Sequence, residues 1–315
     1  MIQLVCIYFI IKYVFTKMLH RFFRSNSCVR LPRDSIVYKQ KSDKSLRGGE
    51  NFHREYGENR YKFLNETKDI VQKTHPHVSI AFDKCMKKKV LIKKCRMIRN
   101  ELNSIFKFSE CNFIEKIIQY DFLHNIVIYN YNENKDLSEY MQKYPMTIEQ
   151  CTNVVLSPIL QALEFIHKKG YAHRDIKPEN ILYYDDGCKL IDFEFCEPLP
   201  ECGHYSNRNG TLEFMAPEVT YREGCLESDI WSLGLVYYEC IYKRLPYHSK
   251  QYDKSNYHQL FEQIRTKNIL IDLDLDLSII EIFKLMLSRN VKIRKNCYDK
   301  VYALINSIDW KNDNF

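Results

Sequence analysis

The sequence predicts an α+β fold in which strands occupy the first half of the chain and helices the second. Short apolar runs that suit strands lie at residues 78–83, 90–93 and 125–129. A long amphipathic pattern follows at 147–169, and a strongly apolar run that suits a buried helix lies at 229–242. A run of strands followed by a run of helices is typical of α+β proteins.

The first half is expected to contain one helix among its strands. Val78–Asp83 and Val90–Lys93 are predicted strands with a turn between them, and Arg99–Ile105 is the predicted helix. Residues 110–118 are predicted to form a loop and a further strand, and Asn125–Tyr129 the last strand. These runs are short and bounded by polar residues, as strands of a small sheet should be.

The second half is expected to begin with a long amphipathic helix. Thr147 and Gln150 have the spacing of a capping box, which satisfies two backbone N–H groups at a helix start. Pro158 lies inside the pattern and predicts a kink, because proline lacks a backbone N–H. The predicted apolar face consists of Leu156, Ile159, Leu160, Leu163 and Ile166.

The composition is that of a globular protein with a basic surface. The chain has 315 residues, 45% of them hydrophobic, which suffices for a substantial core. The net charge is +7 and basic residues gather at 87–99, but no interleaved aromatic or zinc-binding pattern indicates nucleic-acid binding. Twelve cysteines without a Cys-x-x-Cys pair predict free thiols in a reducing, cytoplasmic compartment.

Two segments precede the predicted domain. Residues 1–24 are a hydrophobic N-terminal segment, and their apolar part, 1–19, approaches the length of about 20 residues that a bilayer span needs. Lys12 disfavours insertion, so the alternatives are a membrane anchor, an apolar arm packed on the domain and a translation start assigned too early. The basic residues at 17, 21 and 24 would keep the following chain in the cytosol. Residues 25–66 are polar and lack periodicity, which predicts a linker or tail.

The most informative stretch is residues 171–194. It contains a His-Arg-Asp triplet at 173–175, then Lys177 and Asn180, and finally Asp192 followed by phenylalanine. Phosphoryl transfer needs a carboxylate to receive the proton of the attacking hydroxyl and ligands for the metal ions that neutralise the phosphates. In residue types and spacing this stretch resembles the eukaryotic protein-kinase family. A polar hairpin without chemistry is the alternative, and the number of matching residues argues against it.

This resemblance implies a serine/threonine protein kinase with a small β-rich N-lobe and a larger α-helical C-lobe over residues 67–311. The implied cofactors are ATP and Mg²⁺, which Mn²⁺ can replace, and the implied partner is a protein substrate. Asp175 would be the catalytic base, and Lys177 would stabilise the transferred phosphoryl group. That lysine distinguishes the serine/threonine kinases of the family from its tyrosine kinases. Asn180 and Asp192 would be the metal ligands.

The resemblance also locates the nucleotide. The run ending at Lys93 resembles the Val-Ala-Ile-Lys motif, so Lys93 would bind the α and β phosphates and Glu101 would hold it by an ion pair. Only eight positions separate the two, so the helix would have to start almost at the end of the strand. The residues expected to flank adenine are Val78, Leu91 and Leu182.

Residues 210–218 resemble the end of a kinase activation segment. Thr211 would lie beside the catalytic base and help to shape the substrate platform. Arg174 can pair with a phosphate, so activation by phosphorylation at Tyr205 or Ser206 is a hypothesis. Mass spectrometry of active protein tests it, and full activity without phosphate in this loop would contradict it.

Other resemblances concern structure and specificity. Asp229 would fasten the backbone of the catalytic loop, and Arg294 would be the buried partner of Glu218. The acidic positions that favour basic substrates in some family members are matched by Asp136, Glu179 and Glu239.

Three departures from the family pattern alter the predicted nucleotide-binding site. No glycine lies between Gly57 and Gly170, so the glycine-rich phosphate loop is missing and its place falls on residues 71–76. Leu91 replaces a small alanine and should narrow the adenine pocket. Glu194 replaces the glycine after Asp-Phe and sets a carboxylate near phosphate, which is unfavourable unless a metal ion screens it.

Two alternatives stay open, and the three departures favour the first of them. The first is a pseudokinase, a binding or scaffold module with an altered nucleotide pocket. Retention of Lys93, Asp175, Asn180 and Asp192 argues against it, because a scaffold has no need of all four. The second is a small-molecule kinase, which would not need the peptide platform predicted at 210–218.

Overall fold

The computed structural model describes residues 60–63, 77–133, 136–247, 257–295 and 297–310. All of these residues belong to one compact unit within Glu55–Phe315. The hydrophobic segment 1–24, most of the predicted linker 25–66 and the place of the missing glycine loop at 71–76 lie outside the described residues. No helix in the described part of the chain has the length and apolarity to cross a bilayer.

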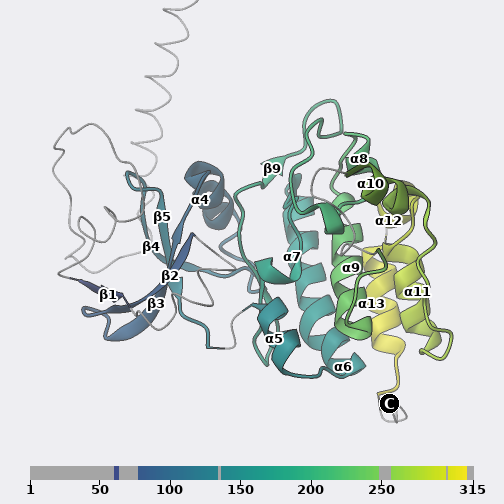
Figure 1. The fold of residues 1–315 in the computed structure, drawn as a ribbon, viewed down its shortest axis with the longest axis horizontal. Coiled ribbons are helices and arrows are strands. Elements are labelled where there is room, and N and C mark those ends of the chain that lie inside the picture. Colours follow the sequence, from purple (N-terminus) through teal and green to yellow (C-terminus); the bar gives the residue numbers. More distant parts are fainter. Residues whose placement is uncertain (1–59, 64–76, 134–135, 248–256, 296, 311–315) are drawn as a thin grey trace, which may run out of the picture. The chain divides into compact units, whose positions relative to one another are not determined.

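The N-terminal lobe is built on a five-stranded sheet with the strand order β1-β2-β3-β5-β4 (Figure 1). All neighbouring strands in it are antiparallel. Helix α4, Ile98–Lys107, follows β3 after only three residues. The strands are β1 Tyr61–Phe63, β2 Val78–Asp83, β3 Lys88–Lys94, β4 Ile117–Asp121 and β5 Ile126–Asn130.

The sheet has one face that carries the predicted nucleotide residues. In β3, Val90 is fully buried, whereas Leu91 and Lys93 lie on the opposite face, because successive side chains of a strand alternate. Val78 of β2 is paired with Lys93, and Tyr129 of β5 is paired with Leu91. Directly paired residues share a face, so these four side chains line the same side of the sheet.

The C-terminal lobe is helical and surrounds α9, which the sequence predicted to be buried on several faces. That prediction is confirmed, since Trp231, Leu235 and Tyr237 are fully buried. Helices α7, α11 and α12 contact α9 (Figure 1). The helices are α5 Leu137–Lys143, α6 Ile148–Gln150, α7 Ser157–Lys168, α8 Pro217–Thr220, α9 Ser228–Tyr242, α10 Tyr257–Thr266, α11 Leu277–Met286, α12 Val291–Lys295 and α13 Tyr298–Ser307. With the β-rich N-terminal lobe, this arrangement confirms the predicted two-lobed α+β fold.

The helix predicted at 147–169 begins as expected. Thr147 and Gln150 form the predicted capping box, with each side chain accepting the other residue's backbone N–H. All five residues of the predicted apolar face are fully buried in the core. Local capping and apolar periodicity therefore suffice to place this helix.

The same helix changes its winding immediately before Pro158. A π-helical turn, Cys151–Leu156, joins α6 to α7. Pro158 has no N–H to offer the carbonyl of Val154, and that carbonyl instead accepts the N–H of Cys188 at 2.8 Å. The wider turn and the outside donor keep the helix continuous through the proline.

Two predicted boundaries differ from the structure. Strand β1 lies inside the range 25–66 that was assigned to a linker, so the sheet begins before residue 67. Three residues are too few to produce a periodic signal, although Tyr61 is buried. The loop and strand predicted at 110–118 are present, but strand β4, Ile117–Asp121, continues beyond residue 118.

Candidate active site

The predicted catalytic loop lies between two short strands, β6 Tyr171–Ala172 and β7 Ile181–Leu182. One buried carboxylate from α9 holds its backbone. Asp229 accepts the N–H groups of His173 at 2.7 Å and Arg174 at 2.9 Å. The predicted fastening of the loop by Asp229 is therefore confirmed.

The fastening carboxylate is kept ionised by its donors. Burial opposes the ionisation of Asp229, but the hydrogen bond from His167, the nearby imidazoles and the loop N–H groups hold its pKa below the ordinary value. The His167 Nε2 atom lies 3.0 Å from Asp229 Oδ2. A negative charge is thus available to orient the loop at neutral pH.

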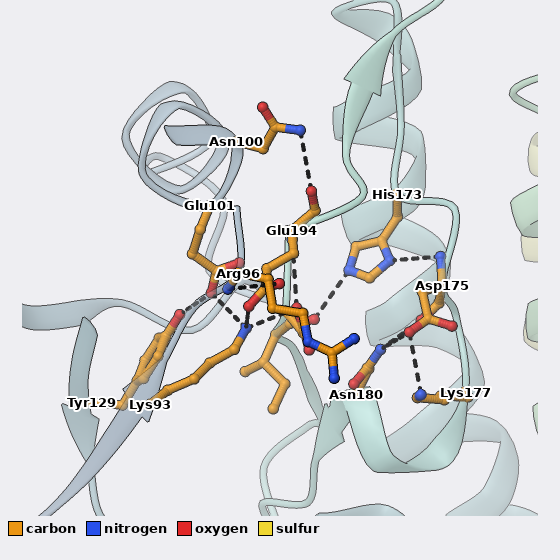
Figure 2. A network of polar contacts seen from close by, with 12 residues as sticks. Lys93, Arg96, Asn100, Glu101, Tyr129, His173, Asp175, Lys177, Asn180 and Glu194 are labelled. Atoms are coloured by element: carbon orange, nitrogen blue, oxygen red, sulfur yellow. Dashed lines mark hydrogen bonds and ion pairs between the residues drawn. The ribbon is translucent and has the colours of Figure 1, made fainter. Parts of the chain in front are cut away.

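The carboxylate of Asp175 lies at the centre of a polar cluster (Figure 2). Its Oδ1 atom accepts the backbone N–H of Thr211 at 2.9 Å and the Thr211 hydroxyl at 2.8 Å. Its Oδ2 atom accepts Asn180 Nδ2 at 2.9 Å and lies 3.2 Å from Lys177 Nζ. Lys177 Nζ also donates to the Thr211 hydroxyl at 2.9 Å. The structure brings these four predicted residues together.

The second cluster surrounds the amine of Lys93 (Figure 2). Lys93 Nζ lies 3.2 Å from Glu101 Oε1 in α4, so the expected ion pair is formed. It also lies 2.7 Å from Asp192 Oδ1 and 3.4 Å from Glu194 Oε1. Tyr129 donates its hydroxyl to Glu101 Oε1 at 2.5 Å, which adds the sheet to this network.

The charges of this cluster reinforce one another. Burial alone would lower the pKa of Lys93, but the charges of Glu101, Asp192 and Glu194 raise it. Burial alone would raise the pKa of Asp192, but the charge and hydrogen bond of Lys93 hold it below the ordinary value. At neutral pH the cluster therefore contains a protonated lysine and an ionised Asp192.

Backbone hydrogen bonds connect the two clusters. The strand that ends just before Asp192 is β8, Lys189–Leu190, and it pairs with β7. The N–H of Ile191 donates to the carbonyl of Asn180 at 3.0 Å. His173 Nε2 lies 3.0 Å from the carbonyl oxygen of Ile191, and the ring of Phe193 packs edge-on against His173. These contacts fix Asp192 beside the catalytic loop.

Arg174 of the predicted catalytic loop also contacts the predicted activation segment. The Arg174 guanidinium donates to Glu197 in β9, Glu197–Pro198, and to Asn207, and it stacks over the ring of Tyr205 at 4.3 Å. The carboxylate of Glu197 therefore binds Arg174 at the place where the sequence suggested a phosphate. Loop phosphorylation stays a prediction.

Comparison with known proteins agrees with this geometry. The family model described as Protein kinase domain matches residues 69–305. The chain belongs to the protein kinase family.

Similar kinases share limited parts of this kinase domain. 3-phosphoinositide-dependent protein kinase 1 of Rattus norvegicus is 35% identical over 114 residues, which are 35% of this chain and 20% of that protein. Serine/threonine-protein kinase ppk6 of Schizosaccharomyces pombe is 32% identical over 162 residues, 50% of this chain and 19% of that protein. Developmentally-regulated protein kinase 1 of Dictyostelium discoideum is 28% identical over 179 residues, 56% of this chain and 25% of that protein. The chain thus spans a quarter or less of the length of these relatives.

The side chains of this kinase domain fit a metal–nucleotide complex. Asn180 and Asp192 offer amide and carboxylate oxygens, which are ligand types that Mg²⁺ accepts. Glu101 Oε2 is buried and has no hydrogen-bond partner among the described residues. Val78 and Leu91 are half-buried on the sheet face described above. Leu182 lies in β7 of the other lobe and is 8% exposed, and its contact with adenine stays a prediction.

Sequence reasoning missed three contacts of this kinase domain. It did not anticipate that Tyr129 would donate to Glu101, that Glu197 would bind Arg174, or that Glu194 would lie beside Lys93. Each joins residues far apart in the chain. The sequence alone identifies Glu194 as a departure from the family motif. Its contact with Lys93 could not be predicted, because that contact depends on the tertiary structure.

Proposed function

We propose that this kinase domain transfers the γ-phosphate of ATP to serine or threonine hydroxyls of proteins. The arrangement of Asp175 carries the proposal. A carboxylate that is fixed by Thr211 and Asn180, with the ammonium of Lys177 beside it, suits the orientation and deprotonation of an alcohol.

The chain's own residues divide the work. Asp175 orients the attacking hydroxyl and receives its proton, while Lys177 stabilises negative charge on the transferred group. Thr211 holds both side chains in place through its hydroxyl. Because Thr211 is hydrogen-bonded to both side chains, and Asp175 and Lys177 form an ion pair, little reorganisation is needed when a substrate binds.

The nucleotide is assigned to the Lys93 cluster. MgATP supplies the phosphoryl group and a cation that neutralises its oxygens. Asn180 and Asp192 would hold Mg²⁺ or Mn²⁺, and Lys93, fixed by Glu101, would orient the phosphates. Val78, Leu91 and Leu182 would flank the adenine.

Two observations support serine/threonine specificity. Lys177 is the residue that distinguishes such kinases in the family, and its amine is directed at Asp175 and Thr211. One relative, ppk6, is itself named a serine/threonine-protein kinase. A protein substrate belongs to the same proposal, as does a kinase domain over the predicted range 67–311 extended at its start to include β1.

A preference for basic substrates is a finer part of the proposal. Glu179 Oε2 and Glu239 Oε2 are buried without hydrogen-bond partners among the described residues. Their charges interact, since Glu179 helps to raise the pKa of Glu239. A cationic substrate side chain would neutralise the negative charge of both carboxylates. Asp136 is differently used, because its side chain caps α5 by accepting the N–H of Glu139.

The location of the protein in the cell is proposed from its sequence. The apolar run 1–19 supports membrane association, and the basic residues after it support a cytosolic kinase domain.

The decisive experiment compares wild type with Asp175→Asn in transfer of labelled phosphate from MgATP to a generic protein substrate. Loss of the base should lower the rate about 100-fold to 10,000-fold, since general-base catalysis contributes factors of this size. Asp185→Asn makes the same chemical change at an exposed turn and should leave the rate unchanged. Equal signal from wild type and Asp175→Asn would refute the enzymatic assignment and favour a scaffold. Label in small metabolites but in no protein would instead favour a small-molecule kinase.

A further inference from the structure

Glu194 is held in place by the region around the start of α4. Its Oε2 atom accepts the backbone N–H of Arg96 at 3.2 Å, and its backbone carbonyl accepts Asn100 Nδ2 at 3.1 Å (Figure 2). The residue is 8% exposed. Its carboxylate is therefore fixed close to the nucleotide residues and cannot turn freely into solvent.

The fixed carboxylate of Glu194 adds negative charge around the amine of Lys93. Lys93 Nζ lies within 3.4 Å of oxygens from Glu101, Asp192 and Glu194. Three carboxylates around one ammonium give a local excess of negative charge when all are ionised. Such a surrounding repels an incoming polyphosphate even though it contains the lysine that should bind it.

A divalent cation removes this repulsion. It can be shared between carboxylate oxygens of the cluster and phosphate oxygens, both of which are hard ligands that Mg²⁺ accepts. The benefit of the cation grows with the negative charge that it neutralises. Glu194 adds one such charge beyond Glu101 and Asp192.

We propose that Glu194 determines the specificity of this site for cation-bound nucleotide. With Glu194 present, nucleotide binding depends on a bound divalent cation far more strongly than it would with Lys93, Glu101 and Asp192 alone. The inference rests on the proposed function, because it assumes that the cluster around Lys93 is a nucleotide site. It concerns the binding step and is independent of catalysis by Asp175.

A glutamine at position 194 separates the charge of the side chain from its shape. The amide oxygen of Glu194→Gln can still accept the N–H of Arg96, and the backbone bond from Asn100 is untouched. If Glu194 served only to attach the segment to α4, this variant would bind nucleotide as the wild type does. A purely electrostatic contribution disappears with the charge.

The experiment is calorimetric titration of ADP into the full chain, once with saturating Mg²⁺ and once with EDTA. The ratio of the two dissociation constants measures the coupling between cation and nucleotide. We expect Glu194→Gln to tighten metal-free ADP binding and to lower this ratio about tenfold, which corresponds to about 1.4 kcal/mol. Glu201→Gln removes a charge from an exposed turn and should leave the ratio unchanged. Glu194→Gly serves in its place if the glutamine variant fails to fold.

The outcomes separate the inference from the proposed function. Binding of ADP with the same coupling ratio in wild type and Glu194→Gln overturns the inference and leaves the nucleotide site standing. Absence of binding in every variant, with Mg²⁺ present, overturns the nucleotide site and the inference together. A ratio that falls in Glu194→Gln but not in Glu201→Gln supports both.

Discussion

At the scale of single residues, Gly210 shows how closely the activation segment approaches the catalytic loop. Its φ is +103°, and a Cβ atom built on it would lie 2.3 Å from the carbonyl oxygen of Arg174. A backbone oxygen cannot move aside as a flexible side chain can. Any side chain at 210 must therefore displace the segment, including Thr211 and its bonds to Asp175.

Gly210→Ala is expected to lower both stability and phosphate transfer. The positive φ costs about 1–2 kcal/mol for a residue with a Cβ, and the clash adds about 1–3 kcal/mol. Gly203→Ala is the matched control, because Gly203 also has a positive φ, +78°, but open space around its Cβ position. Urea unfolding and the phosphate-transfer assay provide the measurements. Equal effects of the two substitutions would show that the close approach does not matter.

At the scale of elements, α9 carries a carboxyl group that should couple stability to pH. Burial and then the charge of Glu179 raise the pKa of Glu239 from 4.5 to about 7. Between these values the folded protein keeps a proton that the unfolded chain has lost. Stability from this group therefore falls as the pH rises through that window.

Glu239→Gln retains the shape of the side chain without the titration. Relative to this variant, the wild type should lose stability between about pH 5 and pH 8. Urea unfolding of both proteins across this range measures the difference, with the exposed Glu223→Gln as control. Parallel pH curves for wild type and Glu239→Gln would contradict the expected shift.

Elements with a local signal were predictable from the sequence. The capping box at Thr147, the apolar face of α7 and the short apolar runs of β2 and β3 are determined by neighbours within a few residues. Strand β1 has only three residues and exists through its pairing with β2, so no local pattern marks it. The π-helical turn before Pro158 similarly depends on the distant N–H of Cys188.

In the candidate site, too, some contacts were predictable from the sequence and others were not. Family spacing anticipated the grouping of Asp175, Lys177 and Thr211, and the ion pair of Lys93 with Glu101. The sequence predicted that the carboxylate of Glu194 lies near phosphate, but the motif named no protein partner for it, because a family glycine has no side chain. The contacts of Glu194 with Lys93 and Arg96 follow from how α4 meets the segment after β8, which only the folded chain defines.

At the scale of the whole molecule, a buried arginine ties together four parts of the helical lobe. Arg294 of α12 is fully buried and donates to Glu218 in α8, confirming the predicted pair. It also donates to the carbonyl of Glu227 at 3.0 Å and to the carbonyl of Ser288. The end of the activation segment, the start of α9 and the loop after α11 therefore share one guanidinium.

Arg294→Met should destabilise the entire domain. The substitution leaves the carboxylate of Glu218 buried without its cation, although Ser228 still donates to it at 2.7 Å. Breaking such a pair costs about 3–5 kcal/mol, a large part of the roughly 5–15 kcal/mol that stabilises a typical domain. Lys292→Met makes a similar change on the exposed side of α12 and should cost less than about 0.5 kcal/mol. Because three segments lose their common partner on α12, the urea unfolding curves monitored by tryptophan fluorescence and by circular dichroism should shift by the same amount. A loss confined to the activation segment, with the helices unfolding at the wild-type midpoint, would show that Arg294 acts locally and does not bind the lobe together.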